Sequence, residues 1–132
     1  MKVVAHEDQL REQWRTGVET RMQVSARNGA AQLCIFEQWV APTAGAPTHS
    51  HAVEEVLTIV SGEASVWVGD SSEILFGGQS LIVPAGQKHG FRNVGSATLH
   101  VHAVLASSVF EAMFDGLADP VRRWLPAPAD SN

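Results

Sequence analysis

Two histidines and two glutamates stand close together in one short segment, residues 48–56, whose sequence is THSHAVEEV. His49 and His51 are two residues apart, and Glu54 and Glu55 follow as a pair. Imidazole nitrogens and carboxylate oxygens are common ligands of transition metal ions. The segment is therefore either a polar, solvated turn or one half of a metal site, and the rest of the sequence must distinguish the two.

The geometry of a β-strand decides which of these side chains can meet. Alternate side chains of a strand point to the same face, so His49 and His51 share one. If a single strand runs unbroken over residues 49–59, Glu55 lies on that face as a ligand. Glu54 then points away as a solvated or outer neighbour. Three apolar residues share the inner face with the ligands: Val53, Leu57 and Ile59.

A second segment, residues 78–93, has the sequence GQSLIVPAGQKHGFRN. The two segments together resemble the cupins, whose motifs are G-x5-H-x-H-x3,4-E-x6-G and G-x5-P-x-G-x2-H-x3-N. The first motif is matched by His49, His51, Glu55 and Gly62, and the second by Gly78, Pro84, Gly86, His89 and Asn93. One position departs from the pattern: the leading glycine of the first motif is Thr43 here, with Gly45 nearby. The departure concerns the entry turn and not the ligands.

The resemblance implies an all-β fold of the RmlC-like type, a double-stranded β-helix or small jelly-roll barrel. It also implies one divalent transition metal ion inside the barrel, held by His49, His51, Glu55 and His89. Three imidazoles and one carboxylate suit Fe, Mn, Ni, Cu or Zn, and affinity alone does not distinguish these metals. Such a site leaves a coordination position open, as catalysis requires. Asn93 is expected to cap a turn.

The remaining pattern agrees with a barrel, because short apolar runs alternate with turns that contain glycine or proline. The predicted strands are 33–40, 55–60, 63–68, 80–84 and 98–105.

Three regions are expected along the chain. Residues 1–17 form an N-terminal arm, in which 5–15 is either a short helix or irregular, and residues 18–106 form the cupin barrel. Residues 107–132 are predicted to be a short C-terminal helical segment and tail. Apolar residues recur there at helical spacing, namely Phe110, Met113, Phe114 and Leu117.

Composition excludes several classes of partner. The net charge of −5 and the scattered basic residues argue against nucleic acid. Neither a membrane-spanning run nor a signal peptide is visible, so we expect no membrane partner and a cytoplasmic protein. The single cysteine, Cys34, forms no intrachain disulfide and is expected to be a buried apolar side chain. The two end segments hold more apolar surface than one barrel needs to cover, which predicts a homodimer. The residues concerned are Trp14, Phe110, Phe114 and Trp124.

The predicted substrate pocket is apolar and consists of Val53, Leu57, Ile59 and Phe91. Lys88 and Arg92 have the opposite parity to His89 and should point away, so no cation is expected inside. A phosphosugar would then face an apolar wall, which argues against the phosphosugar isomerases among the cupins. The chain has no tyrosine, the residue on which thiol dioxygenases of this superfamily rely. An apolar or aromatic small molecule that chelates the metal through its own oxygen is favoured.

Two pairs of residues on other strands stay open. His100 and His102 share a face, which is either the pocket or the exterior; if it is the pocket, His102 is a candidate catalytic base. Gln38 and Trp39 have opposite parity, so at most one of them lines the pocket.

Two functional classes follow from the resemblance. One is a mononuclear metal dioxygenase similar to quercetinase, in which Glu55 is a ligand and a catalytic proton acceptor. The other is a non-redox cupin, either a Lewis-acid isomerase or lyase or a small-molecule-binding protein without turnover. Redox turnover needs Fe, Mn, Cu, Ni or Co, whereas zinc would indicate the second class.

Overall fold

Extended segments separated by short turns account for most of the chain in the computed structural model, which describes residues 1–128. The strands are β1 (Glu12–Arg15), β2 (Val18–Val24), β3 (Cys34–Val40), β4 (Gly45–Ser50), β5 (Glu55–Ser61), β6 (Glu63–Val68), β7 (Ser71–Phe76), β8 (Gln79–Val83), β9 (His89–Asn93), β10 (Leu99–Leu105), β11 (Phe110–Phe114) and β12 (Val121–Arg123). Two single 3-10 turns, η1 (His6–Asp8) and η2 (Ala26–Asn28), are the helical elements of the described residues. The predicted all-β fold is confirmed.

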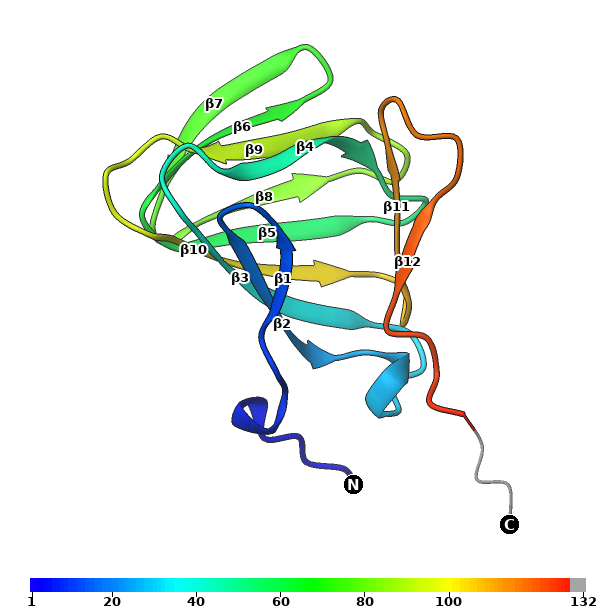
Figure 1. Ribbon diagram of the computed structural model, residues 1–132. Coiled ribbons are helices and arrows are strands. Elements are labelled where there is room, and N and C mark those ends of the chain that lie inside the picture. The colour runs from blue at the N-terminus through cyan, green and yellow to red at the C-terminus, as the bar shows by residue number, and fades with distance from the viewer. Residues whose placement is uncertain (129–132) are drawn as a thin grey trace.

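The strands form two six-stranded antiparallel sheets (Figure 1). One has the order β1-β2-β3-β10-β5-β8 and the other the order β12-β11-β4-β9-β6-β7. Consecutive strands often lie in different sheets, so the chain crosses repeatedly from one sheet to the other, as a jelly roll requires. Apolar side chains of both inner faces fill the space between the sheets, including Val18, Ile59, Leu99 and Val101, none of which is exposed.

The predicted C-terminal helix is wrong. Residues 110–114 form β11, which pairs with β4, and residues 121–123 form β12, which pairs with β11. The helical spacing of apolar residues concealed a strand alternation, since Phe110 and Ala112 are buried while Met113 is exposed. The last residues of the predicted tail, 129–132, lie outside the described residues.

The N-terminal arm is also more ordered than expected, because β1 pairs with β2 at the edge of the first sheet. Its side chain Trp14 packs with three aromatic rings from other parts of the chain, at centroid distances between 4.9 and 5.6 Å. These rings are Phe36, Phe110 and Trp124. The expectation of a homodimer rested largely on these residues, and they cover one another within a single chain. The homodimer stays a prediction.

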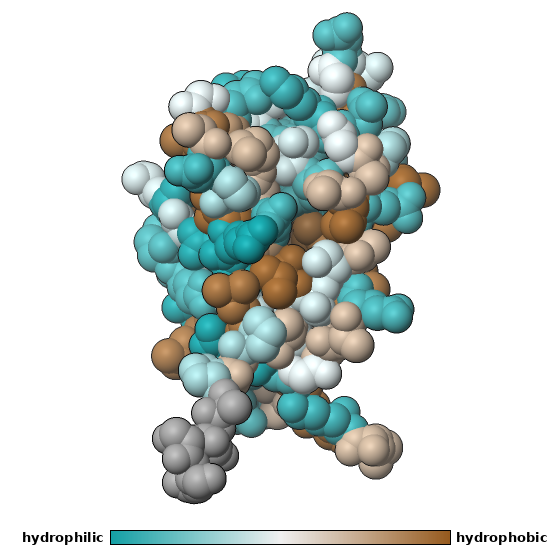
Figure 2. All heavy atoms as spheres, turned by 90° about the vertical axis from the view of Figure 1, so that its right-hand side faces the viewer, coloured by the Kyte–Doolittle hydropathy of each residue, from teal (hydrophilic) through white to brown (hydrophobic). Residues whose placement is uncertain are grey.

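The outer surface on the side of β11 and β12 mixes strongly hydrophilic and hydrophobic atoms side by side near its middle (Figure 2). Within residues 1–128, no helix is long and apolar enough to cross a membrane.

Candidate metal centre

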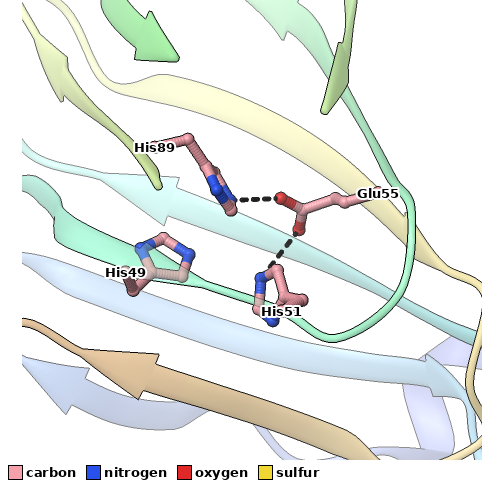
Figure 3. A group of neighbouring side chains, drawn as sticks. All are labelled: His49, His51, Glu55 and His89. Atoms are coloured by element: carbon pink, nitrogen blue, oxygen red, sulfur yellow. Dashed lines mark hydrogen bonds and ion pairs between the residues drawn. The ribbon is translucent and has the colours of Figure 1, made fainter. Parts of the chain in front are cut away.

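Four side chains converge in the interior of the barrel, and all four are less than 7% exposed: His49, His51, Glu55 and His89 (Figure 3). Each offers one ligand atom, and these atoms lie within 4.8 Å of one another. The four residues predicted from the motifs are therefore brought together as a group that could hold a metal ion.

The strand that was expected to run unbroken over residues 49–59 is interrupted. β4 ends at Ser50, His51 follows it, and β5 begins at Glu55 in the other sheet. His49 lies opposite His89 in the register of β4 and β9, so the second sheet supplies two imidazoles. The residue directly after β4 supplies the third, and the first sheet supplies the carboxylate. Glu55 is buried and Glu54 is exposed, as the parity argument predicted, although the two glutamates lie beyond a break in the strand.

The Nδ1 atom of every histidine in the group donates to a backbone carbonyl. The acceptors are Pro47 for His49 and Glu111 for His51, both at 2.7 Å, and Gln87 for His89 at 2.9 Å. Because a carbonyl oxygen can only accept, Nδ1 carries the proton in each ring, and Nε2 is the atom available for a ligand.

The Nε2 atoms meet the carboxylate of Glu55. His89 Nε2 lies 2.9 Å from Oε1 and His51 Nε2 lies 3.7 Å from Oε2. Within residues 1–128, His51 Nε2 is a buried atom without a hydrogen-bond partner. A buried polar atom without a partner costs free energy, and a metal ion at this place would remove that cost. The donor set fits a transition metal ion.

Burial and charge set the protonation of the group. Burial, together with the charge of His89, lowers the pKa of His49 to about 4, and burial also lowers the pKa of His51. Burial alone would raise the pKa of Glu55, but the His89 hydrogen bond and the neighbouring imidazoles lower it. The pKa of His89 is raised because its bond to Glu55 outweighs burial. Two neutral imidazoles and an ionised carboxylate are thus ready to bind a metal ion, which would compete with a proton for His89.

A cavity of about 30 Å³ lies directly beside the ligand atoms, enough for about one water molecule. A second space of about 360 Å³, called the vestibule below, lies against the same side chains and has a volume typical of small-molecule sites. The two spaces share four lining residues: Trp14, Arg15, Phe110 and Phe114.

Two of the four predicted pocket residues, Leu57 and Phe91, line the inner cavity. The other two do not. Ile59 is fully buried in the core, and Val53 lines a separate space beside Leu105. The unbroken strand assumed for residues 49–59 misplaced Val53, which lies in the loop between β4 and β5.

Sequence reasoning missed most of the aromatic wall. The inner cavity is also lined by residues of three further strands: Phe36 and Gln38 of β3, Ala103 of β10, and Phe110 and Phe114 of β11. Phe114 stacks on His49 at a centroid distance of 5.1 Å. Of the two open candidates on β3, Gln38 faces the cavity; its alternation with the buried Phe36 could have identified it.

The prediction of a pocket without a cation is wrong, because Arg15 lines it. Residues 1–17 were expected to form an arm, whereas residues 12–15 form β1, which joins the first sheet. A β-bulge interrupts this pairing: Gln13 pairs with Glu19 and Arg15 with Val18, which leaves Trp14 as an extra residue. The bulge lets two consecutive side chains, Trp14 and Arg15, line the same cavity. Lys88 and Arg92, by contrast, are exposed as predicted.

His102 does not join the site, so its predicted role as a catalytic base there is wrong. Its neighbours in β10, Val101 and Ala103, are fully buried in the core, which places His102 on the outer face of the strand. His100 shares that face, where its Nε2 lies 2.9 Å from Glu37 Oε1.

The turns around the site behave as the motifs imply. Asn93 is 1% exposed; its Nδ2 donates to the carbonyls of Val40 and Ala97, and its Oδ1 accepts from the backbone of Gly95. Asn93 therefore caps turns, as expected. Thr43 has a φ of 73°, the left-handed conformation that the motif assigns to glycine.

Comparison with known proteins agrees with this geometry. The profile of the cupin domain matches residues 36–105. An RmlC-like cupin from Shewanella frigidimarina is 21% identical, with a TM-score of 0.69, over 78% of this chain and 87% of its own. The polyketide cyclase RemF from Streptomyces resistomycificus is 22% identical, with a TM-score of 0.74, over 90% of this chain and 88% of its own. A recombinant oxalate oxidase in complex with glycolate is 20% identical, with a TM-score of 0.65, over 74% of this chain and 55% of its own. No curated protein matches the sequence significantly.

At these identities the structural likeness establishes the fold, and the domain profile, which covers more than half of the 132 residues, establishes the family. The chain belongs to the cupins, as a small cupin-domain protein with four residues that could hold a metal ion.

Proposed function

We propose that this cupin is a mononuclear metal dioxygenase that acts on a small aromatic molecule which chelates the metal. The observation that carries the proposal is the convergence of three Nε2 atoms and one carboxylate beside a cavity lined by aromatic side chains. When bound there, a redox-active ion would supply an open position for the substrate oxygen and for O2.

The shape of the cavity supports an aromatic chelating substrate. The inner space of about 30 Å³ admits only the coordinating atoms of a ligand. Its rings would lie in the vestibule of about 360 Å³, against Trp14, Phe110 and Phe114. Covering apolar surface of this kind is worth about 25 cal/mol per Å².

The chain's own residues have separate tasks in this proposal. His49, His51 and His89 hold the ion, each fixed in orientation by its backbone carbonyl. Glu55 is the fourth ligand, and its second oxygen accepts the proton that the substrate hydroxyl loses on binding. The lowered pKa of Glu55 keeps the carboxylate ionised, as a metal ligand must be. The packed aromatic wall limits the access of water.

A non-redox reaction is the second candidate, because histidine and carboxylate ligands also suit zinc. An isomerase, a lyase or a binding protein without turnover would then use the same pocket. A polyketide cyclase has the same fold.

The experiment that separates the two is elemental analysis of protein purified without added metal, followed by oxygen-electrode measurements with flavonols and catechols. Fe, Mn, Cu, Ni or Co together with substrate-dependent oxygen uptake is the expected result. A His49→Ala variant should show neither the metal nor the uptake, and Glu54→Gln, with its exposed side chain, is the matched control that should show both. Zinc alone, with no oxygen uptake by any substrate, would contradict the dioxygenase and support the non-redox reaction.

A further inference from the structure

Two arginines line the vestibule in front of the metal centre. Arg15 comes from the bulge of β1 and lines both the inner cavity and the vestibule, whereas Arg123, the last residue of β12, lines the vestibule. Both are partly buried. They come from opposite ends of the chain and from different sheets, so the fold alone brings them to one cavity.

Neither arginine has a carboxylate partner within the part of the chain that the structure describes. Arg15 Nη1 donates to the carbonyl of Gly45 at 3.1 Å, which leaves its other donors free of protein partners there. Arg123 lies over the ring of Trp14, 4.2 Å from its centroid, and its Nε is buried without a hydrogen-bond partner among residues 1–128. A buried guanidinium donor without an acceptor costs free energy that a ligand oxygen would recover.

The nearby acidic groups are engaged elsewhere. Asp115 lines the vestibule, but it is exposed and pairs with Lys88, whose Nζ lies 3.0 Å from its Oδ1. Glu12 accepts hydrogen bonds from the indoles of Trp14 at 3.1 Å and Trp124 at 3.2 Å.

The two guanidinium groups also repel each other. Burial, followed by the charge of Arg123, lowers the pKa of Arg15. Burial likewise lowers the pKa of Arg123, and Glu12 opposes this effect. Arginine stays charged at neutral pH despite such shifts. Two like charges face a common space, and an anion placed between them would relieve the repulsion.

We propose that the vestibule binds a carboxylate of the ligand between Arg15 and Arg123 while the chelating oxygens of the same molecule reach the metal centre. The planar guanidinium matches the geometry of a carboxylate. The aromatic wall between the arginines and the metal centre supports the carbon skeleton. This inference rests on the proposed function and narrows its substrate class to aromatic carboxylates, whereas the sequence predicted a pocket without a cation.

The test compares three probes on the zinc-loaded protein, in which redox turnover does not interfere: catechol, 3,4-dihydroxybenzoate and 3,4-dihydroxybenzamide. Calorimetric titration should show the benzoate binding at least about tenfold more tightly than the benzamide, which has the same size without the charge. In Arg123→Met this preference should fall to less than about threefold, while the affinity for catechol stays within about threefold of the wild type. Arg15→Lys, which keeps a charge and loses the planar fork, should reduce the preference in part.

Arg92→Met is the matched control, since Arg92 is exposed on β9. It should leave all three affinities unchanged. Catechol binding without any preference for the benzoate would overturn the carboxylate site and leave the proposed function standing. A failure of all three probes to bind would count against the proposed function itself. Phenyl phosphate binding more tightly than benzoate to the metal-free protein, with the difference lost in Arg123→Met, would also overturn the assignment to a carboxylate.

Discussion

Replacing Glu55 by glutamine removes the one carboxylate from the group of four ligands and changes almost nothing in shape. Glu55 is 5% exposed, and its two oxygens lie 2.9 Å from His89 Nε2 and 3.7 Å from His51 Nε2. Glu54, the preceding residue, is exposed. Glu54→Gln is therefore the matched control, because it makes the same chemical change at the neighbouring position and leaves the four ligands intact.

The expected magnitude follows from mass action. A metal at 100 times its Kd stabilises the folded protein by about 2.7 kcal/mol. Residues that merely support a ligand change metal affinity by about 10–100-fold, so the loss of a ligand should cost about 100-fold or more. The same metal concentration then stabilises Glu55→Gln by about 0.4 kcal/mol. The difference of about 2.3 kcal/mol corresponds to a loss of roughly 7–12 °C in the metal-induced rise of Tm for a chain of 132 residues.

The assay is thermal denaturation with and without zinc, combined with metal content by elemental analysis. Glu54→Gln should keep the full metal-induced rise in Tm and a stoichiometric metal content. If Glu55→Gln keeps both and Glu54→Gln loses them, the assignment of the ligand is refuted.

Three further outcomes are expected. Thr43→Gly should raise the free energy of unfolding by about 0.5–1 kcal/mol in urea denaturation, because a φ of 73° is strained for threonine. The backbone hydrogen bond from Thr43 N to the carbonyl of Asn93 is kept in this variant. A loss of stability would contradict the prediction. Cys34 is fully buried and burial raises its pKa to about 12, so it should resist thiol reagents at pH 8 until the protein unfolds; rapid labelling of the native protein would refute its burial. Light scattering at micromolar concentration should give the mass of a homodimer, and a monomer mass would remove that prediction.

The ligands could be predicted from the sequence because they lie at fixed spacing in two short segments. Parity chose Glu55 over Glu54 correctly even though the strand is broken between His51 and Glu55. The reason is that the chain enters the opposite sheet at Glu55 with that side chain facing inward. The spacing of the motif predicts this orientation, whereas the assumption of an unbroken strand gave it for the wrong reason.

The vestibule could not be predicted in the same way, because the segments that build it meet only through long-range pairing. Nothing local in residues 110–114 distinguishes a strand from a helix, since Phe110 and Phe114 are spaced suitably for both; pairing with β4 decides the outcome. Arg15 was missed because residues 12–15 have no clear strand pattern and become β1 only by pairing with β2, with a bulge that the residue types do not indicate.

The support of His51 has a consequence for how such centres vary between related chains. Its ring is held by the peptide carbonyl of Glu111, sixty positions along the chain and outside both motifs. Any amino acid at that position offers the same carbonyl. The type of residue can therefore change between related chains, whereas its position in the strand cannot. The contact therefore depends on the path of the backbone and not on the side chain at position 111. Substitutions at that position would leave the contact in place, whereas a shift of the strand by one residue would remove it.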